Sequence, residues 1–103
     1  MAVHLTRRRG ETESNPHTSH FLAALEELKT VDPERPDCWL ADENDWIISA
    51  FDSGLVILQN AETGERPWHM RGVSKTEIVR LWNLLASAKL DEIRRLPWLP
   101  GHS

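Results

Sequence analysis

The sequence predicts an α+β fold, in which a three- to four-stranded antiparallel β-meander is flanked by an N-terminal helix and a C-terminal helix. Residues 38–71 alternate short runs of β-forming residues with polar turns, which is typical of consecutive strands. Apolar residues at helical spacing come before this region and again after it. Because the turns are short, neighbouring strands are expected to pair antiparallel.

Length and composition indicate one α+β domain over residues 15–103. The chain has 103 residues, of which 40% are hydrophobic and 27% charged, values that are ordinary for a globular protein. The net charge of −4 provides no general attraction to nucleic acid or to an anionic membrane. Five Trp without any Tyr is unusual, and Trp is enriched both in cores and at binding surfaces.

Residues 1–14 are polar and lack periodicity, so we expect a flexible leader. They contain a basic triplet, Arg7 to Arg9, which is either a solvated tail or an arm that contacts phosphate groups.

The first helix is expected to start at Asn15 and Pro16, or at Thr18 and Ser19, and to end before Pro33. Its apolar stripe is formed by residues at helical spacing: Phe21, Leu22, Leu25 and Leu28. The second helix begins after Ser74, which forms a capping box with Glu77. Its stripe carries Ile78, Leu81, Trp82 and Leu85, and a short final helix precedes Pro97.

Four strands are expected between these helices. Their ranges are Cys38 to Ala41, Trp46 to Phe51, Leu55 to Asn60 and Arg66 to Arg71. Pro67 suits an edge position, because proline cannot donate to a neighbouring strand.

No nucleotide-binding, hydrolase or zinc signature is present, and we expect no cofactor and no metal site. His17 and His20 share a helix face, but a zinc site needs at least three protein ligands. His69 is the remaining candidate for a catalytic residue, with a carboxylate as partner; a structural histidine is the simpler interpretation.

The single cysteine, Cys38, has no partner for an internal disulfide, so we expect a buried thiol and a cytoplasmic protein. No apolar run approaches the length of about 20 residues that spans a bilayer.

Both faces of the central strands are apolar, although a solvated antiparallel sheet needs only one apolar face. Either the helices cover both faces, or they share one face and the other is an interface. We favour the second arrangement and predict a binding surface rimmed by Asp42, Glu43 and Asp45, with Phe51 and Val56 as apolar contacts.

These observations favour a small, non-catalytic protein-binding module, most concretely an immunity-type or inhibitor protein that covers the active surface of a basic toxin or enzyme. The same surface would also suit self-association. One alternative is a nucleic-acid-associated regulator that uses the basic C-terminal helix and the Arg7 to Arg9 arm. A second alternative is a small enzyme built on His69.

Overall fold

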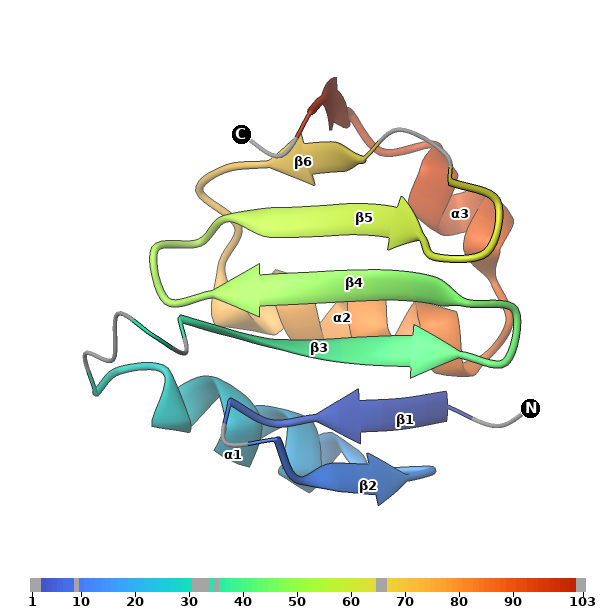
Figure 1. Ribbon diagram of the computed structural model, residues 1–103. Coiled ribbons are helices and arrows are strands. Elements are labelled where there is room, and N and C mark those ends of the chain that lie inside the picture. The colour runs from blue at the N-terminus through green and yellow to red at the C-terminus, as the bar shows by residue number, and fades with distance from the viewer. Residues whose placement is uncertain (1–2, 9, 31–33, 35, 65–66, 102–103) are drawn as a thin grey trace.

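A computed structural model describes residues 3–8, 10–30, 34, 36–64 and 67–101. Over these residues the chain forms an α+β fold with a seven-stranded antiparallel sheet and three helices (Figure 1). The elements are β1 Val3–Thr6, β2 Thr12–Ser14, α1 Thr18–Glu27, β3 Asp37–Asp42, β4 Trp46–Phe51, β5 Val56–Asn60, β6 Trp68–Met70, α2 Lys75–Ala86, α3 Leu90–Arg94 and β7 Leu99–Pro100. The strand order in the sheet is β2-β1-β3-β4-β5-β6-β7.

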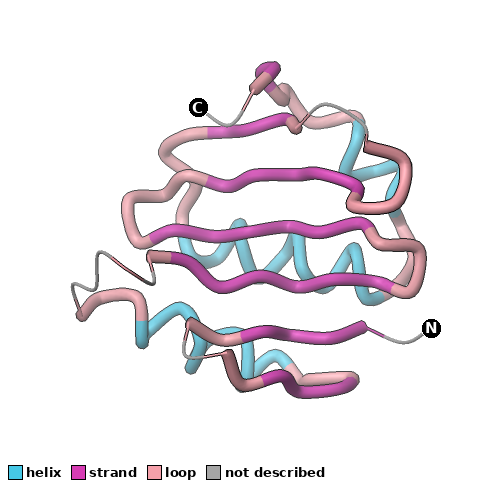
Figure 2. Tube along the Cα trace, viewed as in Figure 1, coloured by secondary structure: helices cyan, strands magenta, loops and turns pink. Residues whose placement is uncertain are grey.

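The helices lie on one face of the sheet, and no helix of the described residues covers the other face (Figures 1 and 2). The core fills the space between the sheet and the helices. Its largest fully buried side chains are Trp82, Phe21, Leu5, Leu40, Ile48 and Leu58. The strands alternate as expected, because Cys38 and Leu40 of β3 are fully buried on the helix side while Trp39 between them is partly exposed.

The predicted meander is present as β3 to β6, but the sheet is larger than three or four strands. β1 and β2 extend it on one side and β7 on the other. The prediction of a flexible leader over residues 1–14 is therefore corrected: Val3 and Leu5 are 3% and 0% exposed and belong to the core. β1 has only four residues, too few for a recognisable alternation.

Charged side chains of the β1–β2 hairpin contact α1. Arg7 forms ion pairs with Glu13 (3.0 Å) and Glu27 (3.1 Å). Arg8 donates hydrogen bonds to the carbonyl oxygens of Glu27 and Thr30, at and just beyond the C-terminal end of α1. Arg9 lies outside the described residues.

Helix α1 begins at Thr18 with His17 at the N-cap position, and not at Asn15. The backbone N–H of Asn15 donates to Val3 O (2.8 Å), and its side chain accepts from Val3 N (3.3 Å), so Asn15 belongs to the hairpin. Phe21, Leu25 and Leu28 are buried as expected, whereas Leu22 is 48% exposed, because it lies beside the apolar stripe. The helix ends at Glu27 with Leu28 at the C-cap position, before Pro33 as expected; Pro33 itself lies outside the described residues.

Helix α2 confirms the predicted start: Ser74 is the N-cap, and its hydroxyl oxygen accepts from the Glu77 backbone N–H at 3.2 Å. Trp82 is fully buried against the sheet, and its indole N–H donates to Ile48 O at 3.1 Å. The Trp82 ring also lies 5.3 Å from the Phe21 ring, so it joins both long helices to the sheet.

The C-terminal segment returns to the sheet after α3. The Trp98 indole N–H donates to Ile93 O (2.7 Å), and Leu99 pairs with His69 of β6. The sheet edge is thus β7 and not the Pro67 strand. Pro67 precedes β6, and its carbonyl oxygen accepts from Gly101 N (2.8 Å).

Candidate functional site

The sheet face that carries no helix is the most extensive candidate for a binding surface. The strand register places Trp39, Ser49, Ile57, His69 and Leu99 opposite one another in a single row across β3 to β7. The outward side chains of β3 to β7 together define the open face: Asp37, Trp39, Ala41, Ile47, Ser49, Phe51, Ile57, Gln59, His69 and Leu99.

Most of the open face is apolar, and its residues differ in exposure. Trp39, Ile47 and Phe51 are partly exposed, and Leu99 is 54% exposed. Ile57 lies in the middle of the row and is only 7% exposed even though no helix lies above it. The side chains beside it on the open face, which include the polar Ser49 and His69, therefore already cover it.

Two aromatic residues define the end of the open face near the β4–β5 turn. Trp39 is paired with Ser49, and Phe51 lies two positions further along β4 on the same face. Such diagonal neighbours are within reach of aromatic side chains. Asp37 is paired with Phe51, and its partial burial raises the pKa of its carboxyl group. Asp52 follows at the turn and is exposed.

Of the two predicted apolar contacts, Phe51 lies on the open face and Val56 does not. Val56 is fully buried and packs in the core, because it pairs with Ala50 on the helix side of the sheet. The alternation within each strand was evident, but the sequence does not indicate which side faces the helices. Trp39, Ile47 and Leu99 were missed, although Trp39 alternates visibly with Cys38 and Leu40.

The acidic residues of the β3–β4 turn, which were predicted to rim the binding surface, differ in their environment. The Asp42 carboxylate is 8% exposed and accepts from the backbone N–H groups of Asn44 and Trp46, both at 2.9 Å, so it holds the turn. Glu43 and Asp45 are exposed. This turn lies at the opposite end of β4 from Phe51, a distance of about 17 Å at the rise of a β-strand. The open face therefore has acidic residues at both ends.

His69 points to the open face, opposite Trp68 and Met70, as the alternation predicted. It is 5% exposed, and its ring Nδ1 hydrogen-bonds the Gly101 carbonyl oxygen at 3.0 Å. Within the described residues it forms no ion pair with a carboxylate. The described residues therefore show a bond from His69 to a backbone carbonyl oxygen, and no His69–carboxylate ion pair among them.

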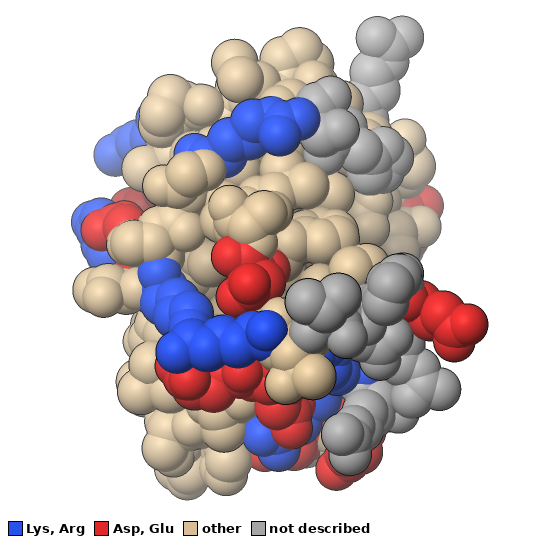
Figure 3. All heavy atoms as spheres, turned by 90° about the vertical axis from the view of Figure 1, so that its left-hand side faces the viewer, with Lys and Arg blue, Asp and Glu red and all other residues tan. Residues whose placement is uncertain are grey.

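Several basic side chains of the described residues lie beside acidic or aromatic groups. Lys75 pairs with Glu26 (3.3 Å), Arg80 with Glu77 (3.5 Å), and the Arg94 guanidinium lies 5.5 Å from the centre of the Trp46 ring. Figure 3 looks onto the end of α1 and the start of α2, and shows blue basic and red acidic side chains lying next to each other. Among the residues that Figure 3 colours, basic and acidic groups are therefore mixed.

His17 and His20 stack with ring centres 5.7 Å apart, and His20 lies 3.5 Å from Glu13. In the part of the chain that the structure describes, no group of three potential metal ligands comes together. The same residues include no helix that is long and apolar enough to span a membrane.

Comparisons of the chain with protein-family models, with curated proteins and with solved structures give no significant match.

Proposed function

We propose that this protein is a non-catalytic protein-binding module that docks a basic partner protein on the open face of its sheet. In its most concrete form it is an immunity-type or inhibitor protein, which covers the active surface of a toxin or enzyme. The observation that carries the proposal is the apolar layer of Trp39, Ile47, Phe51 and Leu99 on a face without helices.

A face that met only water would need no such layer. An antiparallel sheet covered on one side is normally apolar inside and polar outside. Here four of the five strands β3 to β7 contribute apolar groups to the outer side, including two aromatic residues that lie near each other. Contiguous apolar patches on small proteins commonly mark interaction sites, and tryptophan is enriched among the residues that dominate binding energies.

The surrounding charges indicate the chemistry of the partner. Asp37 and Asp52 lie at one end of the open face, with Glu43 and Asp45 at the other, and the chain carries a net charge of −4. Acidic groups around an apolar centre favour a partner with basic groups around an apolar contact, and they accelerate its encounter. The same charges oppose the stacking of two copies of this chain face to face.

The two alternatives have weaker support. The phosphate-binding arm would need Arg7 and Arg8, which are engaged with Glu13, Glu27 and the end of α1. The enzyme would need His69 beside a carboxylate, but its ring is bonded to a backbone carbonyl. The proposal places the protein in the reducing cytoplasm, because Cys38 is buried as a free thiol.

The test is capture of a partner from the native source with three immobilised proteins: the wild type, Phe51→Asp and Leu22→Asp. Leu22 is a matched control, because it is an exposed apolar residue on α1, away from the open face. We expect a basic protein that the wild type and Leu22→Asp retain and that Phe51→Asp loses. Its retention should weaken as salt is added, and its activity should fall when this protein is bound.

Equal capture by all three proteins would contradict the assignment of the open face. Sedimentation of the purified wild type covers the self-association hypothesis. A dimer that Phe51→Asp dissociates would identify a second copy as the occupant and overturn the basic-partner proposal. Denaturant unfolding of each variant confirms that it is folded before its binding is interpreted.

A further inference from the structure

Three side chains lie together at the end of the open face near the β4–β5 turn: Asp37, Trp39 and Phe51. Asp37 and Phe51 are direct partners in the pairing of β3 with β4, and Trp39 lies two positions from Asp37 on the same face of β3. Directly paired side chains have Cβ atoms about 5 Å apart, and diagonal neighbours are about 7–8 Å apart. The three side chains are therefore close enough for one planar group to contact all of them.

The Asp37 carboxyl group occupies a partly desolvated position. Burial raises its pKa, and among the described residues it forms no ion pair with a basic side chain. The described side chains of the open face include no Lys or Arg. By contrast, Glu13, Glu26 and Glu27 each have an Arg or Lys partner. A carboxylate that loses water without gaining a cation gains most from a binding partner that supplies one.

We propose that Asp37, Trp39 and Phe51 form a subsite that binds an arginine side chain of the partner protein. This inference rests on the proposed docking of a basic protein on the open face. A guanidinium group can lie flat on an aromatic ring while its edge donates hydrogen bonds to a carboxylate. The subsite offers both kinds of group. A lysine ammonium fits less well, because it is a compact, strongly hydrated charge without a planar face.

The first experiment uses small probes and needs neither a partner nor a variant. The N-acetyl amides of arginine, lysine and citrulline are titrated into the wild-type protein in the millimolar range, and the Trp39 indole N–H resonance is followed by NMR. Citrulline has nearly the shape of arginine but no charge. The arginine probe should shift the resonance most, the lysine probe less and the citrulline probe least. The arginine probe should also lower the pKa of Asp37, because an adjacent cation favours the ionised carboxyl group.

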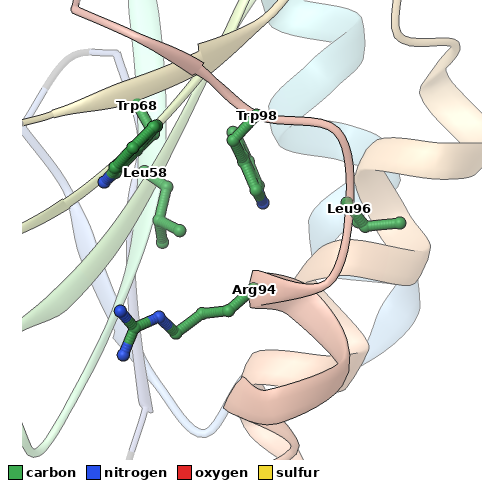
Figure 4. A pocket seen from close by; sticks show the side chains of 5 residues that line it. All are labelled: Leu58, Trp68, Arg94, Leu96 and Trp98. Atoms are coloured by element: carbon green, nitrogen blue, oxygen red, sulfur yellow. The ribbon is translucent and has the colours of Figure 1, made fainter.

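Two further indoles provide an internal control in the same spectra. Trp68 and Trp98 lie on the helix side of the sheet, away from the subsite (Figure 4). There they border a hollow of about 150 Å³, whose lining residues are Leu58, Trp68, Arg94, Leu96 and Trp98. Their resonances should not move. Equal shifts of Trp39 with the arginine and lysine probes, or no shift of Trp39 with arginine, would overturn the proposal.

Asp37→Asn removes the charge of the subsite and keeps the shape of the side chain. It should abolish the preference for the arginine probe and weaken binding of the captured partner roughly tenfold or more, as expected for a hydrogen bond to a charged group. Glu92→Gln is the matched control, because it removes the same charge from an exposed position on α3, on the helix side of the sheet. Equal effects of the two substitutions would show a general charge effect and contradict the role of Asp37.

Trp39→Leu keeps an apolar side chain and removes the aromatic face. It should reduce the discrimination between the arginine and lysine probes, whereas unchanged discrimination would contradict stacking on Trp39.

Two results separate the failure of this inference from the failure of the proposed function. If Phe51→Asp loses the partner while Asp37→Asn retains it at wild-type affinity, the open face docks a protein but the arginine subsite is wrong. If Phe51→Asp retains the partner while the arginine probe shifts Trp39, the docking proposal is wrong and the guanidinium site stands.

Discussion

Trp82 connects the helices to the sheet through a single side chain. It is fully buried, it donates a hydrogen bond to Ile48 O, and it contacts Phe21 of α1. Trp82→Ala should lower the free energy of unfolding by about 3–5 kcal/mol, because truncation leaves a large cavity. Trp68→Ala is the control. Because Trp68 is 36% exposed, this substitution should lower the free energy of unfolding much less in the same denaturant titration. Equal losses would mean that the helix–sheet contact does not depend on Trp82.

Cys38 is chemically protected by its position. It is 0% exposed, and burial, followed by the charge of Asp37, raises the pKa of its thiol from 9.0 to about 12. Because the thiolate is the reactive form, Cys38 should not react with a disulfide reagent until the protein unfolds. Rapid labelling of the native protein at neutral pH would contradict this placement.

The same shift predicts how stability depends on alkaline pH. The unfolded chain releases the Cys38 proton near pH 9.0, while the folded chain holds it until about pH 12. The stabilisation is therefore complete below about pH 9 and is lost as the pH rises toward about 12. Denaturant titrations at about pH 8 and about pH 10.5 should show a decline in the wild type that is smaller in Cys38→Ala. The chain contains no tyrosine, so no phenol titrates in this range.

At the scale of elements, the β1–β2 hairpin contributes to the core and is not an appendage. Leu5 and Val3 lie under the helices, and Arg7 and Arg8 hold the hairpin to the end of α1. Leu5→Ala should therefore cost about 2–5 kcal/mol of stability in a denaturant titration. His4→Ala, at the exposed neighbouring position, should cost little. A stable protein after deletion of residues 1–14 would show that the hairpin is dispensable.

At the scale of the whole molecule, the two faces of the sheet should respond differently to the same substitution. Ile47 and Ile48 are adjacent in β4; Ile47 is partly exposed on the open face, and Ile48 is fully buried under the helices. Ile48→Thr buries a hydroxyl group and should cost about 2 kcal/mol or more. Ile47→Thr should change the free energy of unfolding by less than about 1 kcal/mol, because water reaches the hydroxyl group. Similar losses at both positions would mean that both faces are covered in solution.

The residue patterns alone were sufficient to predict several helices and strands. The stripe of α2, its Ser74 cap and the alternation in β3 to β6 follow from local spacing, and the structure confirms them. These features could be predicted because each depends on residues a few positions apart. The short strands could not: β1 and β7 have four and two residues, and they become strands only because a neighbouring strand pairs with them.

The residue pattern alone shows that both sides of the central strands are apolar. It does not show which side the helices cover, because that depends on how α1, α2 and the sheet pack together. The packing placed Val56 in the core and Phe51, Trp39 and Ile47 on the open face. It also brought Trp68, Arg94 and Trp98 to one hollow, although they come from separate elements and no local pattern links them. The open face and this hollow are thus products of long-range packing, which has no signature in the spacing of neighbouring residues.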